Sequence, residues 1–178
     1  RTTGCQARAW CISIVPHSRG SDGTDAVTGP KPVLVGQAPS RRSDPLRPFS
    51  GSSGARLERH LGIAAGTLGD CFELRNLIDR YPGRKEGAKG DGWDAAAARD
   101  RARALRRELE GRAFVLAGRK VAAAFGVAET PYFVWARFDG TKTSYAVIPH
   151  PSGVDRVWNS PAIAARLRDL VLGIVGLG

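Results

Sequence analysis

The segment that decides the fold is VLVGQAPS, residues 33–40, in which a short apolar run ends in a glycine and a proline-containing loop. Val33–Val35 is apolar without polar alternation, a pattern typical of a strand that is buried on both faces. The break Gly29-Pro30-Lys31-Pro32 precedes this run, and a long loop from Gly36 to Ser53 follows it. A short strand covered on both faces indicates an α/β protein, provided that helices alternate with further strands.

Helical segments do alternate with apolar runs along the rest of the chain. Beyond 33–35, strands are predicted at 71–77, 113–117 and 144–148, and helices at 55–61, 95–110, 120–125 and 161–172. Asp94 and Ser160 stand where N-caps are expected, and Pro161 suits a first helical turn. This alternation predicts a three-layer α/β/α sandwich around a mostly parallel four-stranded sheet.

One domain is expected, because 178 residues suffice for a single core. We predict a flexible N-terminal tail over residues 1–30 and a single domain over 31–178, with Cys11–Pro16 left open as a short edge strand. No apolar stretch approaches the roughly 20 residues that a membrane span needs, and no secretory leader begins the sequence. A soluble cytoplasmic protein without a membrane partner, taken as a monomer, is therefore expected.

Charge and cysteine content restrict the class of protein further. The net charge is +10, from 27 Lys and Arg against 17 Asp and Glu. Such an excess attracts polyanions, usually DNA or RNA, although an arginine-rich proteome would give the same charge. The three cysteines, Cys5, Cys11 and Cys71, are too few for a disulfide framework or a four-thiolate cluster. We therefore predict no metal and no cofactor, with Cys71 as a small core residue.

The unusual loop chemistry lies after three of the predicted strands. Ligand sites in open α/β sheets lie beyond the carboxyl ends of the strands, where the connecting loops meet. The loops that follow 33–35, 71–77 and 144–148 are rich in Gly, Pro, Ser and Lys. Their convergence predicts that the three loops form one site.

Four sequence elements follow one another at these strand ends. They are Gly36–Ser40 with Asp44 and PFSGSSGARL at 48–57, then Asn76, then Ala113–Gly126, and finally His150-Pro151-Ser152. Their order resembles the bacterial and archaeal uracil-DNA glycosylase families, whose first motif reads G-E-A-P-G-x-x-E-D followed by P-F-x-G-x-x-G-x-x-L, and the H-P-S motif of their superfamily. The resemblance covers about residues 32–172. Each element alone is common, so the specificity of the resemblance rests on the four elements occurring in the same order.

The resemblance implies a site for a pyrimidine base that is flipped out of the DNA stack. Phe49 would stack on the base, and the Asn76 amide would read the base edge as donor and acceptor. His150 would donate a hydrogen bond to the base O2 while the glycosidic bond breaks. From the residues alone, the alternatives are a core phenylalanine, an asparagine that caps a turn, and a structural histidine.

The resemblance also places DNA contacts in two loops. Phosphate contacts through hydroxyl and backbone groups are predicted at Ser50, Ser52, Ser53 and Ser152. In the loop 153–159, residues that wedge the space left by the base or contact phosphate are predicted at Val154, Arg156 and Trp158. A flexible serine-rich loop and a core tryptophan remain the alternatives.

The first motif departs from the superfamily at the residues that activate water. Gln37 and Ala38 stand where well-studied members carry Asp, Glu or Asn, and glutamine can orient a water but cannot act as a general base. The nearest carboxylate is Asp44, which becomes the candidate catalytic residue unless it only turns the chain before Pro45. Ser40 replaces a tyrosine that blocks a 5-methyl group in uracil enzymes. The base pocket is therefore expected to admit a bulky 5-substituted pyrimidine.

The sequence thus predicts a monofunctional DNA glycosylase that hydrolyses the N-glycosidic bond of a flipped pyrimidine and leaves an abasic site. The predicted substrate is a modified pyrimidine, such as the glucosylated hydroxymethylcytosine of phage DNA, in anti-phage defence. Uracil excision in base-excision repair and a catalytically inactive nucleic-acid-binding protein on the same fold remain alternatives. A small-molecule nucleoside hydrolase is disfavoured by the basic charge, and the cysteine count excludes the thiolate-held iron–sulfur cluster of some relatives.

Overall fold

A central five-stranded sheet organises the computed structural model, which describes residues 30–41, 43–84, 92–152 and 155–173. Its strands are β1 (Val33–Gly36), β2 (Glu73–Asn76), β3 (Phe114–Ala117), β4 (Trp135–Arg137) and β5 (Ser144–Ile148). Their order in the sheet is β2-β1-β3-β5-β4. All neighbours pair in parallel except the edge strand β4, which is antiparallel to β5.

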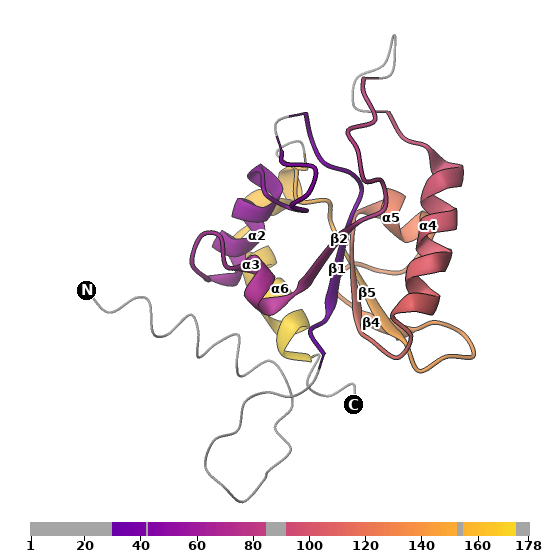
Figure 1. Ribbon diagram of the computed structural model, residues 1–178. Coiled ribbons are helices and arrows are strands. Elements are labelled where there is room, and N and C mark those ends of the chain that lie inside the picture. The colour runs from indigo at the N-terminus through magenta and orange to yellow at the C-terminus, as the bar shows by residue number, and fades with distance from the viewer. Residues whose placement is uncertain (1–29, 42, 85–91, 153–154, 174–178) are drawn as a thin grey trace, which may run out of the picture.

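Helices cover both faces of the sheet (Figure 1). One layer holds α2 (Ser52–Leu61), α3 (Leu68–Cys71) and α6 (Pro161–Leu172), and the other holds α4 (Ala95–Glu108) and α5 (Arg119–Ala124). A short 3₁₀ helix, η1 (Arg156–Asn159), precedes α6. The predicted α/β/α sandwich with a mostly parallel sheet is confirmed.

Two apolar cores lie on the two faces of the sheet. Leu34 and Val115 belong to the core under α2, α3 and α6, whereas Val35 and Leu116 belong to the core under α4 and α5. The central strands β1 and β3 are buried along their whole length. Burial on both faces explains why these strands are continuous apolar runs in the sequence.

The structure corrects the predicted number of strands from four to five. The additional strand, β4, has three residues, is partly exposed and pairs only with β5. A short edge strand buries too little apolar surface to give a readable hydrophobic pattern. The expected edge strand at Cys11–Pro16 and the expected tail over 1–30 concern a part of the chain that, except for Pro30, lies outside the described residues, so the domain division stays a prediction.

Local predictions differ mainly at element ends. The strand predicted at 71–77 is shorter, because residues up to Cys71 form α3 and the strand begins at Glu73. Cys71 is 6% exposed in the core, as predicted, and it is also disulfide-bonded, which the cysteine count did not predict. Asp94 caps α4, since its carboxylate accepts hydrogen bonds from the backbone amides of Ala96 and Ala97. No helix within the described ranges is long and apolar enough to cross a membrane.

The parallel strands bring distant segments to one edge of the sheet. Gly36 is in register with Asn76, and Ala117 is in register with Ile148. The segments that follow these residues therefore leave the sheet on the same side. This carboxyl edge is where the candidate site lies.

Candidate active site

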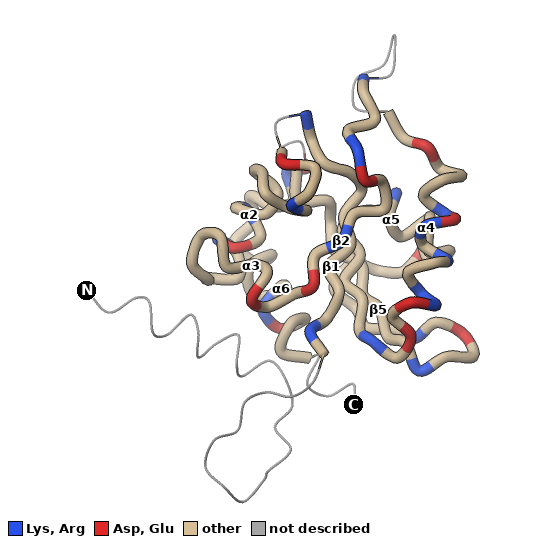
Figure 2. The backbone as a smooth tube through the Cα atoms, in the orientation of Figure 1, with Lys and Arg blue, Asp and Glu red and all other residues tan. Residues whose placement is uncertain are grey.

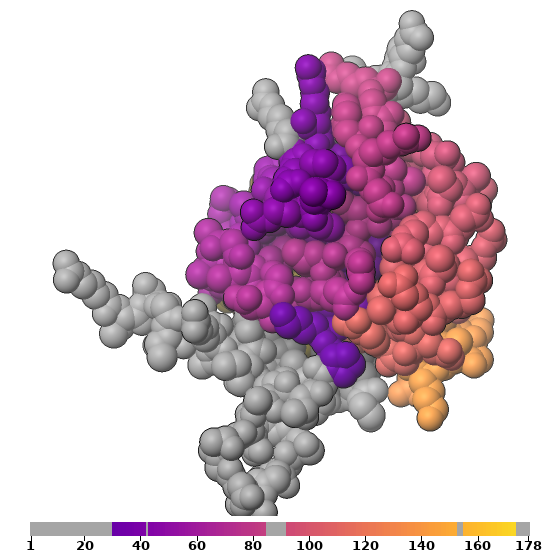
Figure 3. Space-filling model, in the orientation of Figure 1, coloured from indigo at the N-terminus to yellow at the C-terminus, as the bar shows by residue number. Residues whose placement is uncertain are grey.

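A cleft of about 180 Å³ opens at the carboxyl edge of the sheet. Its walls come from the loop after β1, the start of α2, the end of β2, the residues before α4 and the segment after β5. Figure 3 shows the loop after β1 (indigo) beside the segment after β2 (magenta) on one face of the molecule. The predicted site residues that line this cleft are Gln37, Ser40, Phe49, Ser52, Ser53, Asn76, His150 and Ser152.

Phe49 and Asn76 meet over the last residue of β1. A Cβ atom on Gly36 would lie 2.6 Å from Asn76 Oδ1 and 2.9 Å from Phe49 Cζ. Real Cβ atoms do not approach other atoms this closely, so only glycine allows both side chains to reach the floor of the cleft. The glycine that ends β1 is thus a steric requirement of the site.

Phe49 has a strained backbone. Its φ angle is 62°, in the left-handed region that non-glycine residues rarely adopt. A Cβ on Gly54 would lie 1.9 Å from the Phe49 carbonyl oxygen, so α2 packs directly against this backbone. Such strain costs about 1–3 kcal/mol and is found mainly at functional sites. The surrounding loop therefore holds the Phe49 ring against the cleft at a local energetic cost.

The Asn76 side chain is available to a ligand. It stands at the last position of β2 and is half-buried. Among the described residues, none forms a hydrogen bond with its amide. Two donor hydrogens and an acceptor oxygen therefore remain for a group that enters the cleft. The Gln37 amide, on the loop after β1, lines the same cleft.

The surroundings of His150 favour the neutral form of its imidazole. Burial lowers the pKa of its imidazole below the ordinary value of 6.5; the charge of Asp155 opposes this shift, and that of Lys120 adds to it. The Ser152 backbone amide donates a hydrogen bond to His150 Nδ1 over 3.3 Å. Since an amide N–H can only donate, we assign the ring proton of neutral His150 to Nε2. The imidazole can thus offer an N–H donor without carrying charge.

Side-chain hydrogen bonds hold the backbone of the segment after β5. Trp158 Nε1 donates to the His150 carbonyl oxygen over 2.8 Å, and Arg56 Nη1 donates to the Ser152 carbonyl oxygen over 2.8 Å. On the other side, Gly118 has a φ of 99°, and a Cβ there would lie 2.9 Å from His150 Cβ. These contacts leave the imidazole little freedom to move.

Two predicted residues do not reach the cleft. Asp44 is exposed, and its Oδ1 accepts a hydrogen bond from the Leu46 amide over 2.9 Å, so it turns the chain. Ser50 is also exposed, and its Oγ accepts from the Asp44 amide in the same turn. Asp44 thus forms the turn that the alternative predicted, and its assignment as a catalytic carboxylate stays a prediction. Within the described part of the chain, the cleft is lined by no carboxylate.

The DNA-contact residues predicted in the loop 153–159 also lie in different surroundings. Trp158 is only 2% exposed and belongs to the core under α2 and α6, so its side chain is not a surface wedge. The predicted DNA contact at Trp158 is corrected to a core residue that holds the His150 backbone. Arg156 is exposed at the start of η1, and its role stays a prediction. Val154 lies outside the described residues.

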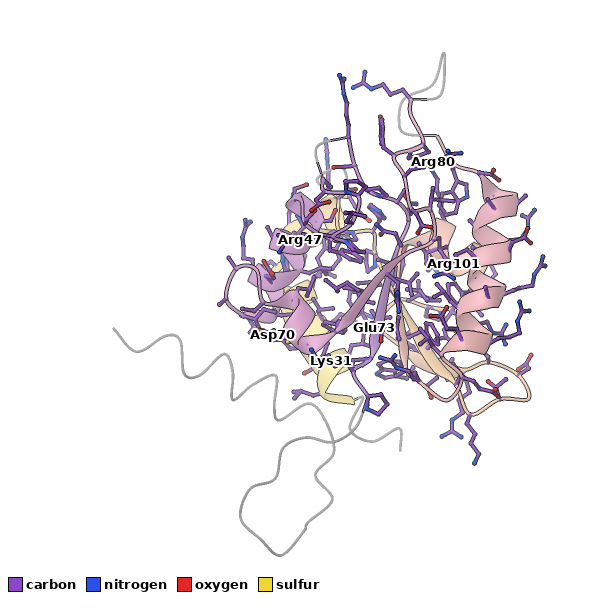
Figure 4. The ribbon with its side chains drawn as sticks, viewed as in Figure 1. Lys31, Arg47, Asp70, Glu73, Arg80 and Arg101 are labelled. Carbon is purple, nitrogen blue, oxygen red and sulfur yellow. The ribbon has the colours of Figure 1, made fainter. Side chains whose placement is uncertain are left out.

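One aromatic wall of the cleft and a group of nearby basic residues were not predicted from the sequence. Trp93, just before α4, lines the cleft together with Pro82 and Gly92. The available signal was a tryptophan directly after a glycine-rich loop that follows a strand. Exposed arginines also lie on the loops after β1 and β2, at Arg41, Arg47, Arg80 and Arg84. Figure 4 shows Arg80 at the end of the molecule where these loops lie.

Metal ligands are not grouped in the described ranges, where no cluster of three or more His, Cys, Asp or Glu could hold an ion. The cleft is instead built from an aromatic ring, amide groups, hydroxyl groups and a neutral imidazole. The fold and these groups define a class of protein, namely an α/β protein whose candidate ligand site is a small polar cleft at the carboxyl edge of its sheet.

Comparison with protein families identifies the family. The model described as the uracil DNA glycosylase superfamily matches residues 25–171, and the chain belongs to this superfamily. The superfamily consists of DNA glycosylases, which are hydrolases that bind DNA. A comparison with curated proteins finds no match.

Proposed function

We propose that this chain is a monofunctional DNA glycosylase that holds one flipped pyrimidine in the cleft and hydrolyses its N-glycosidic bond. The observation that carries the proposal is that Phe49, Asn76 and the neutral His150 line one cleft. Residues from three loops, far apart in the sequence, thus supply a stacking surface, an edge-reading amide and a hydrogen-bond donor. These are the groups that base excision requires.

The size of the cleft supports a single base as the ligand. Its volume is about 180 Å³. An enclosed cavity of about 150 Å³ is large enough to bind benzene, which has the same ring size as a pyrimidine. One ring therefore fills the slot, with Phe49 against its face and Asn76 at its edge. Any large substituent on the ring would extend toward the open side.

His150 would stabilise the departing base. When the C1′–N1 bond breaks, its electron pair stays with the base, and negative charge collects on O2 and N1. The Nε2–H of neutral His150 would donate a hydrogen bond to O2 as this charge develops. A water oxygen then bonds to C1′, and its proton is released as the base takes one up. The sugar keeps a hydroxyl group at C1′, which leaves an abasic site.

Water activation in this site cannot rest on a carboxylate from the described residues that line the cleft. Gln37 would orient the water through its amide but would not remove a proton. The reaction would then depend mainly on weakening the bond to the base, since a sugar cation that has already formed needs only a weak nucleophile. This places most of the catalytic effect on His150 and Asn76.

We further propose a 5-substituted pyrimidine as the substrate, with glucosylated hydroxymethylcytosine of phage DNA as the example and anti-phage defence as the role. Ser40 lines the cleft, is exposed and lies with its Oγ 2.6 Å from Ser43 Oγ, so this wall consists of small polar side chains. A small wall leaves space beside the ring. The alternative substrate is uracil, because the Asn76 amide suits uracil in one orientation and cytosine in the other.

Three labelled DNA substrates test this function. The protein is incubated with DNA that contains uracil, with DNA that contains glucosylated hydroxymethylcytosine and with unmodified DNA, and alkali then breaks the strand at abasic sites. We expect breaks at the glucosylated base and none in unmodified DNA. Breaks only at uracil would overturn the modified-base proposal and support repair of uracil.

A second candidate function is a nucleic-acid-binding protein without catalysis. The observation that favours it is the absence of a carboxylate from the described residues that line the cleft. The same incubation separates the two functions. Binding without strand breaks on any of the substrates would overturn the glycosylase proposal and support this alternative.

A further inference from the structure

Trp93 is fixed at the cleft by the residues on both sides of it. The Gly92 amide donates to the Gly83 carbonyl oxygen over 2.8 Å, which joins the two sides of the loop after β2. Asp94 on its other side caps α4 through hydrogen bonds of 3.0 and 2.9 Å. The indole is half-buried, packs partly on the core under α4 and α5, and lines the cleft. Trp93 therefore presents a rigid aromatic surface.

Lys120 is the cation that lies near this surface. Its Nζ is 5.9 Å from the centre of the Trp93 ring, and its charge lowers the pKa of His150. Lys120 thus lies near both an aromatic wall of the cleft and the imidazole. It is exposed, and among the described residues it has no carboxylate or hydrogen-bond partner.

The neighbouring Arg119 differs from Lys120 in how its charge is used. Arg119 Nη1 donates to the carbonyl oxygens of Ala128 and Thr130, and its guanidinium lies 3.9 Å from the centre of the Tyr132 ring. Its charge is therefore engaged in holding the segment before β4. Lys120, one residue later, has no such hydrogen bonds among the described residues, and its ammonium group lies over the Trp93 ring at the longer distance of 5.9 Å.

We propose that Trp93 and Lys120 form a second nucleotide subsite beside the base slot, which takes the nucleotide next to the flipped one on the same strand. The neighbouring base would stack on the indole, and its phosphate would contact the ammonium group. Stacking on an aromatic side chain together with a cation for the backbone is the usual way to bind single-stranded nucleic acid. Lys120 Nζ lies over the Trp93 ring, 5.9 Å from its centre, so a nucleotide that stacks on this face would also meet the ammonium group.

The subsite has a consequence for the form of DNA that is bound. This inference rests on the proposed function, since it places the neighbouring nucleotide relative to a flipped base. A base that stacks on Trp93 must leave the stack of the double helix. The subsite therefore favours single-stranded DNA or DNA that is already unpaired over an intact duplex.

Binding of an unmodified thymidine oligonucleotide, labelled for fluorescence anisotropy, tests the subsite without requiring cleavage. The full chain is compared with Trp93→Leu, Trp93→Phe, Lys120→Ala and the control Lys142→Ala, which removes an exposed lysine from the turn between β4 and β5. We expect about a tenfold loss of affinity for Trp93→Leu and most of the affinity to be kept in Trp93→Phe. Lys120→Ala should weaken binding several-fold and lower the salt dependence, and Lys142→Ala should bind like wild type.

The outcomes distinguish this inference from the proposed function. Equal affinity of Trp93→Leu and wild type for the single strand, with the thermal unfolding midpoint unchanged, would overturn the subsite. Equal losses for duplex and single strand would overturn it too. If wild type breaks no DNA but Trp93→Leu and Lys120→Ala still lose single-strand affinity, the glycosylase proposal fails and the subsite stands. Since Lys120 is exposed, its variant tests the subsite even if Trp93→Leu does not fold.

Discussion

The polar side chains at the two ends of the parallel sheet differ in whether they have partners within the protein. At the amino end, Glu73 pairs with Arg75 and Arg112, and Arg112 also donates to the Lys31 carbonyl oxygen. At the carboxyl end, the described residues leave Asn76 and Lys120 without such partners. Figure 4 labels Lys31 and Glu73 at the amino end and Arg80 at the other, and Figure 2 shows that Lys and Arg occur at both ends. The ends therefore differ in how their polar groups are paired.

The difference shows which polar groups serve the fold and which serve a ligand. A half-buried polar group gains stability when it is paired inside the protein, and it costs stability when it is left unpaired. The amino end follows the first case, and Lys31 Nζ there donates to the Gly69 carbonyl oxygen over 2.8 Å. The carboxyl end keeps free amides and a strained Phe49, which lower stability locally. Substitutions at the two ends should therefore change different properties.

The largest effect is expected for His150→Ala, because this change removes the donor to the departing base. We expect the cleavage rate to fall by about 10²–10³-fold, the typical loss for one such donor, with nearly unchanged DNA affinity. Asn76→Ala should cause a loss of similar size. Single-turnover cleavage and equilibrium binding measure the two properties separately.

Asp44→Asn is the matched control for these variants. It removes an exposed charge whose carboxylate only turns the chain, so cleavage should stay close to the wild-type rate. Wild-type turnover in His150→Ala would contradict the site assignment. A loss in Asp44→Asn as large as in His150→Ala would support Asp44 as the catalytic carboxylate.

A medium effect, on stability alone, is expected for Arg112→Ala at the amino end. The side chains of Arg112 and Glu73 are 16% and 28% exposed, so the variant leaves a half-buried carboxylate with one partner fewer. We expect a loss of about 1–3 kcal/mol in the free energy of unfolding. The exposed pair Arg103–Asp100, with side chains 66% and 69% exposed, provides the control, and Arg103→Ala should change stability by less than about 1 kcal/mol.

The pH dependence of this effect follows from Glu73. Burial raises the pKa of its carboxyl, but hydrogen bonds and charges from Arg112 and Arg75 outweigh burial and hold the pKa below the ordinary value of 4.5. A lowered pKa contributes stability above the unfolded value, and this contribution is lost as the pH falls through the folded value. Denaturant unfolding at several pH values should show the Arg112→Ala deficit shrinking in acid. A constant deficit would show that the pair does not act through its charge.

The fold was predictable because its buried strands appear in the sequence as short runs of consecutive apolar residues. Val33–Val35 and Ala146–Ile148 are buried, so their sequences show uninterrupted apolar runs. β4 was not predictable, because its place at the edge depends on pairing with β5 and not on its own residues. The order of strands likewise depends on distant contacts that no local pattern contains.

The site was predictable to the extent that its motifs lie next to strand ends. Asn76 ends β2, and His150 follows the end of β5 after Pro149, so sheet geometry brings them to one edge. Asp44 and Trp158 were misplaced, because the sequence shows that a residue lies in a loop but not which way its side chain turns. Trp93 was missed because its place at the cleft depends on the pairing of Gly92 with Gly83. The sequence pattern thus lacks information on which way a side chain points and which distant residues it meets.

The smallest expected effect is a change in the pKa of His150 when a charged residue at the carboxyl end, Lys120 or Asp155, is replaced. Burial lowers this pKa from 6.5, Asp155 raises it, and Lys120 lowers it. Lys120→Ala should therefore raise the pKa, and Asp155→Asn should lower it further, by amounts that an NMR titration of the imidazole resolves. A shift of opposite sign in either variant would contradict the placement of these charges.

The sign of this pKa shift also fixes how His150 affects stability. Because its folded pKa is lowered, the unfolded chain binds a proton more readily; the full stability is present above the unfolded value of 6.5 and is lost as the pH falls from there through the lower folded value. Lys120→Ala should reduce this loss, since the charged ring would face less repulsion. Unlike Glu73, which is stabilised as a charged group, His150 is stabilised as a neutral one. The neutral form at neutral pH is the form that can donate to a departing base while remaining buried.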